Sequence, residues 1–315
     1  MSVKSTFNNL TNKAKTMIAN YHLFLVSRRD NTVSDHRSDG FFHPSAICSM
    51  CARMLVFPYV KDPRTNMFYK PIKTGDAVLE LIFQNGTFGH IRTQLNLVQM
   101  SLGMLPMDMP TPFVVLQRKP IPAKIRKEFE DLFEQYSHEP AVPMSRLWAL
   151  SLEYFFIEYA ILDAADNVKG HCDAIILTPR GVFVFEFKTW NSFSWAKLSN
   201  EETSHLVQSQ TYVRYCNRQL KMTRVWAESL HGQRALTVSG VKGSLFWYEN
   251  KDNQGMKEYI VLSDEEVEKR IVSLVMLARK YLTMKSLPPQ EWKNKGTKPC
   301  SQCDFNSYCY RKGGC

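Results

Sequence analysis

The chain lacks any run of apolar residues long enough to cross a bilayer, and its first residues lack the uninterrupted apolar region of a secretory signal. We therefore expect a cytoplasmic protein without a membrane partner. Acidic residues are also few, since 30 Asp and Glu stand against 40 Lys and Arg, for a formal charge of +10. This deficit of negative charge favours a polyanionic partner such as nucleic acid.

The composition is otherwise that of an ordinary globular protein. Of the 315 residues, 44% are hydrophobic and 22% are charged. Such a chain is long enough to bury a sizeable core, as one large domain or two medium ones.

Residues 170–189 are predicted to form a β-hairpin. The segments 174–177 and 182–187 are rich in apolar, β-branched and aromatic residues, and the Pro-Arg-Gly sequence at 179–181 is a turn signal. Two adjacent strands are expected.

Three charged residues fall where these two strands would meet. Side chains alternate along a strand, so Glu186 and Lys188 share one face, and Asp173 near the start of the first strand approaches them. Carboxylates are hard oxygen ligands for magnesium or manganese, and the carbonyl of Phe187 would add a further ligand. The Lys188 ammonium would position a water or offset phosphate charge. A divalent-metal site is therefore predicted here.

Cysteines gather at the end of the chain, where residues 300–315 hold half of the eight. Disulfides are disfavoured in a protein without an export signal, so the cluster favours a metal or an iron–sulfur centre. The spacing Cys300-x2-Cys303-x5-Cys309 supplies three thiolates, which together with one distant cysteine would hold a [4Fe–4S] cluster and tie the two ends of the fold together. With Cys315 included, the tail would alternatively bind zinc alone.

Apolar periodicity and turn signals predict the remaining elements. Helices are expected over 1–27, 77–100 with an interruption at 85–86, 125–136, 201–220 and 263–284, the last opened by a capping box at 263–266, and strands over 147–162 and 235–247. Ser45 is expected to cap a short helix that carries Cys48 and Cys51.

Two groups of side chains beside the hairpin have less specific roles. The aromatic and polar segment 190–200 would suit stacking on unpaired bases as well as plain packing. Glu153 or Glu158 would reach the metal as an accessory acid, although surface roles suit both.

The hairpin residues resemble the PD-(D/E)xK nuclease superfamily, with Asp173 as the first acid and Glu186-Phe187-Lys188 as the E-x-K element. His171-Cys172 precedes Asp173, where the family often has proline.

Further motifs resemble the RecB/AddB-type branch of that superfamily, which includes CRISPR-associated exonuclease-like proteins with an iron–sulfur cluster. Their counterparts here are Gly86 with His90, Gln208-x3-Tyr212 on one helix face with His205, and Cys51-Ala-Arg53 upstream of the three tail cysteines. The resemblance spans roughly residues 45–309.

The resemblance implies an α/β fold with a mixed central sheet flanked by helices, a restriction-endonuclease-like core, and N- and C-terminal segments joined by a cysteine cluster. One nuclease domain would span 1–315, made of a basic helical segment (1–44), a helical subdomain (45–145), the PD-(D/E)xK core (146–262), and a C-terminal helix with the cysteines (263–315).

The activity implied is metal-dependent hydrolysis of DNA, exonucleolytic on linear or single-stranded ends, alone or within a recombination or repair complex. Catalytic roles would fall to Asp173, Glu186, Lys188, Gln208 and Tyr212. The metal ligands would be His90, Asp173, Glu186 and Phe187, and the cluster ligands Cys51, Cys300, Cys303 and Cys309, with Cys48 as the reserve for Cys51.

Two alternative functions remain open. One is an iron–sulfur or zinc protein that binds DNA without cutting it. The other is a structure-specific endonuclease on the same core.

Overall fold

The computed structural model describes residues 40–69, 77–104, 113–138, 144–199, 203–228, 232–291, 296 and 300–310. Its helices are α2 (Pro44–Ile47), α3 (Ala52–Val56), η1 (Phe57–Tyr59), α4 (Ala77–Ser101), α5 (Ala123–His138), α6 (Met144–Tyr154), α7 (Ser192–Lys197), α8 (Thr203–Leu220), α9 (Glu265–Thr283), η2 (Cys300–Gln302) and α10 (Asn306–Cys309). Its strands are β1 (Val114–Val115), β2 (Ile157–Asp163), β3 (Val168–Thr178), β4 (Gly181–Trp190), β5 (Arg224–Ala227), β6 (Arg234–Thr237), β7 (Val241–Asn250) and β8 (Met256–Leu262).

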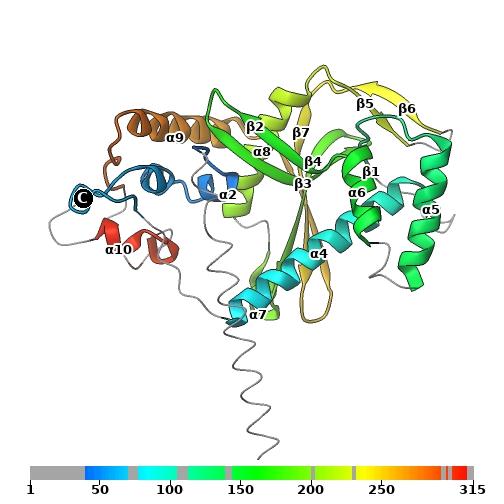
Figure 1. Ribbon diagram of the computed structural model, residues 1–315, viewed down its shortest axis with the longest axis horizontal. Helices are drawn as coiled ribbons and strands as arrows, with labels where there is room; N and C mark the ends of the chain where they lie inside the picture. The colour runs from blue at the N-terminus through cyan, green and yellow to red at the C-terminus, as the bar shows by residue number, and fades with distance from the viewer. Residues whose placement is uncertain are drawn as a thin grey trace, which may run out of the picture.

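The strands form a curled mixed sheet with the order β1-β3-β4-β7-β8, in which β2 pairs with β3 (Figure 1). Neighbouring strands are antiparallel except for β4 and β7, which are parallel. Strands β5 and β6 form a separate two-stranded sheet. The predicted α/β class, with a mixed central sheet flanked by helices, is confirmed.

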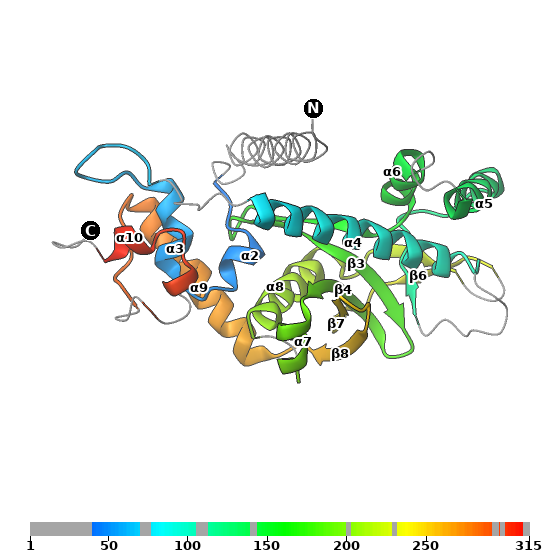
Figure 2. The ribbon, with the colours of Figure 1, turned by 90° about the horizontal axis from the view of Figure 1, so that it is seen from below.

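Alternation along the strands directs apolar side chains into two cores, one on each face of the sheet. Phe183, Phe185 and Phe187 pack with helices α4, α5 and α6 on one face. Val182 and Val184 pack with α2, α3, α8 and α9 on the other. Figure 2 shows α4 lying along one side of the sheet and α8 and α9 on the other side. The end of β4 is thus enclosed between helices from both layers.

The predicted hairpin is confirmed as β3 and β4, which pair antiparallel from Thr178 and Gly181 to Ala174 and Phe185. Gly181 has a φ of 122°, a conformation that glycine adopts without steric cost. The turn signal at 179–181 therefore marked the reversal correctly.

The strand predicted over 147–162 is wrong in its first half. Helix α6 runs to Tyr154, and β2 begins only at Ile157. Leu147, Leu150 and Tyr154 are buried at helical spacing. A nearly continuous apolar run does not separate a buried helix from a buried strand by periodicity alone.

The strand predicted over 235–247 is wrong as a single element, because it is divided between two sheets. Strand β6 pairs with β5, whereas β7 begins at Val241 and joins the central sheet. Gly240, with a φ of 153°, lies at the break.

Helix α4 runs without the interruption predicted at residues 85–86. A glycine inside a helix costs only about 1 kcal/mol relative to alanine, which packing readily offsets. The helices predicted over 125–136 and 201–220 correspond to α5 and to α8, which the structure describes from Thr203.

The two predicted caps are shifted. Helix α9 is capped by Asp264, whose side chain accepts from the N–H groups of Glu266 and Val267, and not by Ser263. Proline at the first position starts α2, so His43 stands at the N-cap in place of Ser45. Cys48 follows α2, and Cys51 is the N-cap residue of the separate helix α3.

An aromatic contact joins the C-terminal segment to the first helices. Phe305 stacks on Phe57 with ring centroids 4.9 Å apart, and both side chains are fully buried. Tyr69 and Tyr308 complete this group of rings. The predicted approach of the two ends of the fold therefore occurs.

The helix predicted over 1–27, and almost all of the predicted segment 1–44, lie outside the described residues. In the part that is described, no helix combines the length and the apolar character that crossing a membrane would require.

Candidate active site

The site lies where β3 and β4 separate. Their last paired residues are Ala174 and Phe185, beyond which β4 stays paired only with β7 and β3 only with β2. Asp173 and Glu186, the next residues on each strand, therefore stand at the mouth of a fork. The N–H of Phe187 donates to Asp173 Oδ2 across it, at 2.6 Å.

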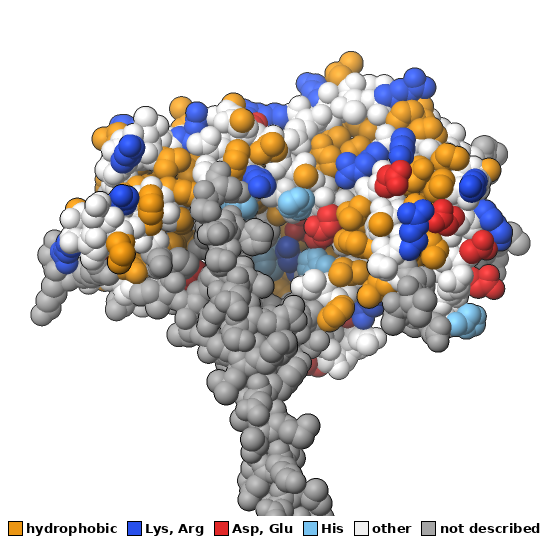
Figure 3. Space-filling view, viewed as in Figure 1, with side chains coloured by type: hydrophobic (Ala, Val, Ile, Leu, Met, Phe, Trp, Pro, Cys, Tyr) orange, Lys and Arg blue, Asp and Glu red, His pale blue; other side chains and the backbone are white. Residues whose placement is uncertain are grey.

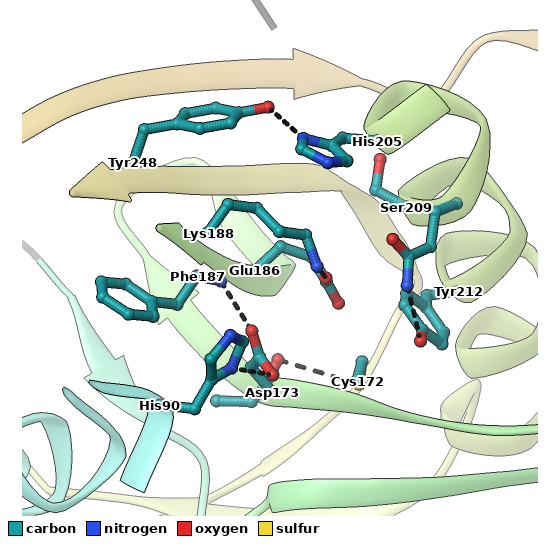
Figure 4. A network of polar contacts seen from close by, with 12 residues as sticks. His90, Cys172, Asp173, Glu186, Phe187, Lys188, His205, Ser209, Tyr212 and Tyr248 are labelled. Atoms are coloured by element: carbon teal, nitrogen blue, oxygen red, sulfur yellow. Dashed lines mark hydrogen bonds and ion pairs between the residues drawn. The ribbon is translucent and has the colours of Figure 1, made fainter. Parts of the chain in front are cut away.

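Asp173 is held from two sides. Besides the Phe187 N–H, its Oδ1 lies 3.0 Å from Nδ1 of His90 on α4 (Figure 4). Burial tends to raise the pKa of Asp173, but the His90 contact, the Lys188 charge and the Phe187 N–H outweigh it and hold the pKa below its usual value. The carboxyl is therefore ionised near neutral pH.

Glu186 and Lys188 lie on the same face of β4, as predicted. They form an ion pair with Nζ 2.8 Å from Oε2, in which Glu186 is buried and Lys188 is partly buried. Burial raises the pKa of Glu186 to about 7, against the opposing effect of Lys188. Burial lowers the pKa of Lys188, but the charges of Glu186 and Asp173 more than compensate and leave it above its usual value. The lysine is thus held as an ammonium.

Nδ1 of His90 contacts Asp173, and Nε2 has no hydrogen-bond partner among the described residues. Burial lowers its pKa, but the contact with Asp173 outweighs this and leaves the pKa raised. Its ring meets the ring of Phe187 edge-on at 5.2 Å. The predicted roles of His90 and of the Phe187 carbonyl as metal ligands stay predictions.

Two residues complete the acidic side of the site. Gln94, one turn after His90 on α4, is fully buried and donates both to the carbonyl of Asp173 and to Oε1 of Glu158. Glu158 on β2 lies opposite Asp173 on β3. The two do not pair, although the residues on either side of them do. Glu158 has a φ of 43°, a strained conformation for a residue other than glycine.

Of the two predicted accessory acids, Glu158 lies at the site and Glu153 does not. Glu158 lines the cavity of the site. Burial raises its pKa, and the charge of Asp173 adds to this while the Gln94 hydrogen bond opposes it. Glu153 lies outside the cavity lining, in an exposed ion pair with Lys119.

Helix α8 supplies the remaining predicted residues. Gln208 Nε2 donates to the hydroxyl of Tyr212 at 3.2 Å. Burial raises the pKa of Tyr212 well above its usual value, and the charge of Glu186 adds to this. His205 on the same helix lies 3.1 Å from the hydroxyl of Tyr248, and burial together with the Lys188 charge lowers its pKa to about 4. His205 is therefore neutral at physiological pH.

Four of these side chains line a cavity of about 500 Å³. Its lining includes His90, Glu158, Lys188 and His205 from four different elements, together with Lys251 after β7. Figure 3 shows a hollow on this face of the molecule in which histidine, basic and acidic side chains gather.

The donor set fits a hard divalent cation. Glu186 Oε1 is buried without a hydrogen-bond partner among the described residues, and a buried polar atom left unpaired costs about 1–3 kcal/mol. A cation bound by this oxygen would remove that cost. Among the residues the structure describes, no three His, Cys, Asp or Glu side chains are already grouped as a metal site. His90 instead engages Asp173, and Lys188 engages Glu186.

The four cysteines predicted as cluster ligands are all partly buried. Burial raises the pKa of Cys51 to about 11, and the charges of Glu291 and Cys303 add to this. Cys303 and Cys309 pack against the ring group of Phe57 and Phe305. Cys315 lies outside the described residues.

Sequence reasoning missed Gln94 and Lys251. Gln94 lies four residues after His90 and therefore on the same helix face, a signal that was available. Lys251 lies far from the motifs along the chain, and only the parallel pairing of β4 with β7 brings it to the site.

Comparison with known proteins supplies one family match. Residues 144–233 match the model described as a nuclease-related domain. This stretch contains Asp173, Glu186, Lys188, Gln208 and Tyr212, but neither His90 nor the four predicted cluster cysteines. The match is compatible with the PD-(D/E)xK superfamily, and it shows neither the RecB/AddB branch nor an iron–sulfur cluster.

The other comparisons add little. No curated protein matches the chain. Among solved structures, the crystal structure of SSO0001 is 17% identical, covers 71% of this chain and 95% of its own, and has a TM-score of 0.28.

Proposed function

We propose that the protein is a metal-dependent deoxyribonuclease, with exonuclease activity on linear or single-stranded DNA ends. The match to a nuclease-related domain supports a nuclease-related hydrolase with nucleic acid as its substrate. The observation that carries the finer proposal is the convergence of Asp173, Glu186 and Lys188 at the fork between β3 and β4.

The roles follow from the contacts. Asp173 and Glu186 would hold magnesium or manganese, which supplies charge stabilisation at the phosphate and lowers the pKa of a bound water. Lys188 has three N–H donors, of which Glu186 engages one. The other two would orient the attacking water and bind a phosphate oxygen.

The surrounding residues would position these groups and the substrate. His90 fixes the carboxylate of Asp173, with its Nε2 left as the predicted metal ligand. Gln208 and Tyr212 would hold the scissile strand from the α8 side.

The test is degradation of end-labelled linear DNA with magnesium or manganese. Glu186→Gln and Lys188→Met are expected to lower the rate at least about 100-fold, because groups that stabilise charge in the transition state contribute several kcal/mol. Glu153→Gln and Lys119→Met make the same changes in an exposed ion pair away from the cavity and should cleave like the wild type.

The cleavage assay can refute or modify the proposal. Absence of cleavage by the wild type, or equal cleavage by all variants at matched folding, would refute the proposal and leave a nucleic-acid-binding protein. Cleavage of covalently closed circles would replace the exonuclease with an endonuclease.

We also propose that Cys51, Cys300, Cys303 and Cys309 hold a structural [4Fe–4S] cluster, with zinc as the alternative. Packing of the C-terminal segment against η1, which continues directly from α3, supports this. Anaerobically purified protein is expected to be brown and to contain iron, and Cys303→Ser should lose both. Colourless protein that contains zinc would show the alternative.

A further inference from the structure

A second hollow adjoins the catalytic cavity. It has a volume of about 420 Å³ and shares Thr189 and Lys251 with the lining of the first. Helix α4 separates the two where it crosses β4, and its residues there include Gly86 and Gly89, which carry no side chain. A Cβ built on Gly89 would lie 3.5 Å from Thr189 Cγ2, so helix and strand are close together and the ridge between the hollows is low.

Phe88 lines the second hollow and is 58% exposed. Two other phenylalanines are exposed to a similar degree, and each has a lysine over its ring, Lys61 over Phe68 and Lys197 over Phe193. No described cation or aromatic ring covers Phe88. Its face is therefore available to a flat ligand.

Two cations border the same hollow. Arg92 follows Phe88 by one helical turn, and its Nη2 is held by Glu249 at 2.5 Å. Lys251 is exposed and makes no ion pair with a described residue. Proteins bind single-stranded nucleic acid with uncovered aromatic rings and nearby cations, through base stacking and phosphate contacts.

We propose that this second hollow binds an unpaired nucleotide next to the scissile phosphate, with its base stacked on Phe88 and the neighbouring phosphates against Arg92 and Lys251. The inference rests on the proposed nuclease function and adds a substrate preference. A base inside a duplex has both faces covered by its neighbours, and the last base of a blunt end, although one of its faces is free, must leave its pair before a single nucleotide can occupy the hollow. The enzyme therefore selects frayed or single-stranded ends over blunt duplex ends.

The experiment measures binding without catalysis. A short oligonucleotide with a fluorescent adenine analogue at its end is titrated with full-length protein in the presence of a chelator, as a single strand and as a blunt duplex. Phe88→Ala is expected to weaken single-strand binding about 5- to 100-fold, the range that loss of one stacked base produces. Phe88→Trp, which preserves stacking, should restore it.

Phe68→Ala is the matched control, because Phe68 is 54% exposed and lines neither hollow. Lys251→Met tests the phosphate contact. It should make the logarithmic salt dependence of single-strand binding shallower by about 0.7, the value of one phosphate contact on a single strand.

The outcomes separate this inference from the function on which it rests. If the wild type binds no oligonucleotide, the inference fails, and the proposed function is decided separately by the cleavage assay with magnesium or manganese. If the wild type binds while Phe88→Ala binds equally well, or Phe68→Ala is weakened as much, only the inference is overturned. Equal affinity of the wild type for blunt duplex and single strand would also overturn it.

Discussion

Glu186 combines a carboxylate that is 2% exposed with an oxygen that has no hydrogen-bond partner among the described residues. Lys188 offsets part of the cost of burying this charge, and the remainder raises the pKa of Glu186 to about 7. The residue therefore takes up and releases a proton in the physiological range unless a cation replaces the proton.

Compared with Glu186→Gln, the metal-free protein should accordingly lose stability as the pH rises from about 5 to 8, while the opposite contribution of His205 is common to both proteins. In the unfolded chain Glu186 ionises near its ordinary pKa of 4.5, whereas the folded protein keeps the proton until about pH 7. The folded state thus binds more protons in this window, and raising the pH disfavours it. Relative to Glu186→Gln, which cannot ionise, the wild type should lose about 1–3 kcal/mol of unfolding free energy.

Urea unfolding at several pH values in the presence of a chelator measures this difference. Tyr212 also has a raised pKa but titrates far above the window, so it does not contribute. A wild-type curve parallel to that of Glu186→Gln would contradict the predicted titration.

Glu158 gives a second prediction for a single residue. The effect of its carboxylate on cleavage can be separated from the effect of its strained backbone on stability. Glu158→Gly and Glu158→Ala both remove the carboxylate from the cavity, and both should lower DNA cleavage at least about tenfold if that charge assists the metal. Only glycine relieves the conformation at φ 43°, so the glycine variant should be about 1 kcal/mol more stable than the alanine variant.

Thermal unfolding and cleavage rates, measured side by side, test both parts. Equal stability of the two variants would show that the backbone is not strained. Wild-type cleavage by both would remove Glu158 from the site.

At the scale of elements, the sequence predicted what depends on neighbours along the chain. The hairpin of β3 and β4, and the shared face of Glu186 and Lys188, follow from alternation and one turn signal. The local pattern failed at 147–162, where apolar residues are too dense to show a period, and at 235–247, where one run serves two sheets.

The site likewise combines residues that local patterns could predict with contacts that depend on tertiary packing. Asp173 could be proposed from its hairpin, and His90 from a resemblance, but their direct contact depends on how α4 packs across β4. Glu158 reaches the cavity where its backbone has a positive φ, and Lys251 reaches it through the parallel pairing of β4 with β7. Neither feature has a local signature in the chain.

The pairing of β7 with β8 depends on the absence of a side chain at Gly243. A Cβ there would stand 2.1 Å from the carbonyl oxygen of Val261, which is backbone and has little freedom to move. Gly243→Ala should therefore displace β8 and lower the unfolding free energy by about 1–3 kcal/mol.

Gly86→Ala is the control for this prediction, since its nearest atom would be 3.9 Å away and alanine favours a helix. It should leave stability unchanged or raise it by up to about 1 kcal/mol. Unfolding in urea compares the two variants, and equal effects would contradict the predicted clash.

At the scale of the whole molecule, the stack of Phe57 and Phe305 joins segments that are far apart in the chain. Phe305→Ala would leave a cavity in this small cluster, away from the two cores that cover the sheet. We expect the segment 300–310 to open locally, because the contacts it loses are its own.

Limited proteolysis should accordingly cut Phe305→Ala within this segment many times faster than the wild type, while the remaining core stays resistant. Phe68→Ala, which changes an exposed ring in the connection between η1 and α4, serves as the control and should be cut like the wild type. Uniform digestion of the whole variant would show instead that the stack supports the entire fold.

The parallel pair of β4 and β7 at the centre of the sheet has a consequence for how the protein folds. Helices α7 and α8 and the small sheet of β5 and β6 all intervene along the chain before β7 can join β4. Contacts between distant segments form slowly, because the loop between them must first be closed. The β3–β4 hairpin should therefore form early, with Glu186 and Lys188 still in water. These charges would be desolvated only in the late, slow phase in which β7 docks, so the step that completes the sheet would also create the site.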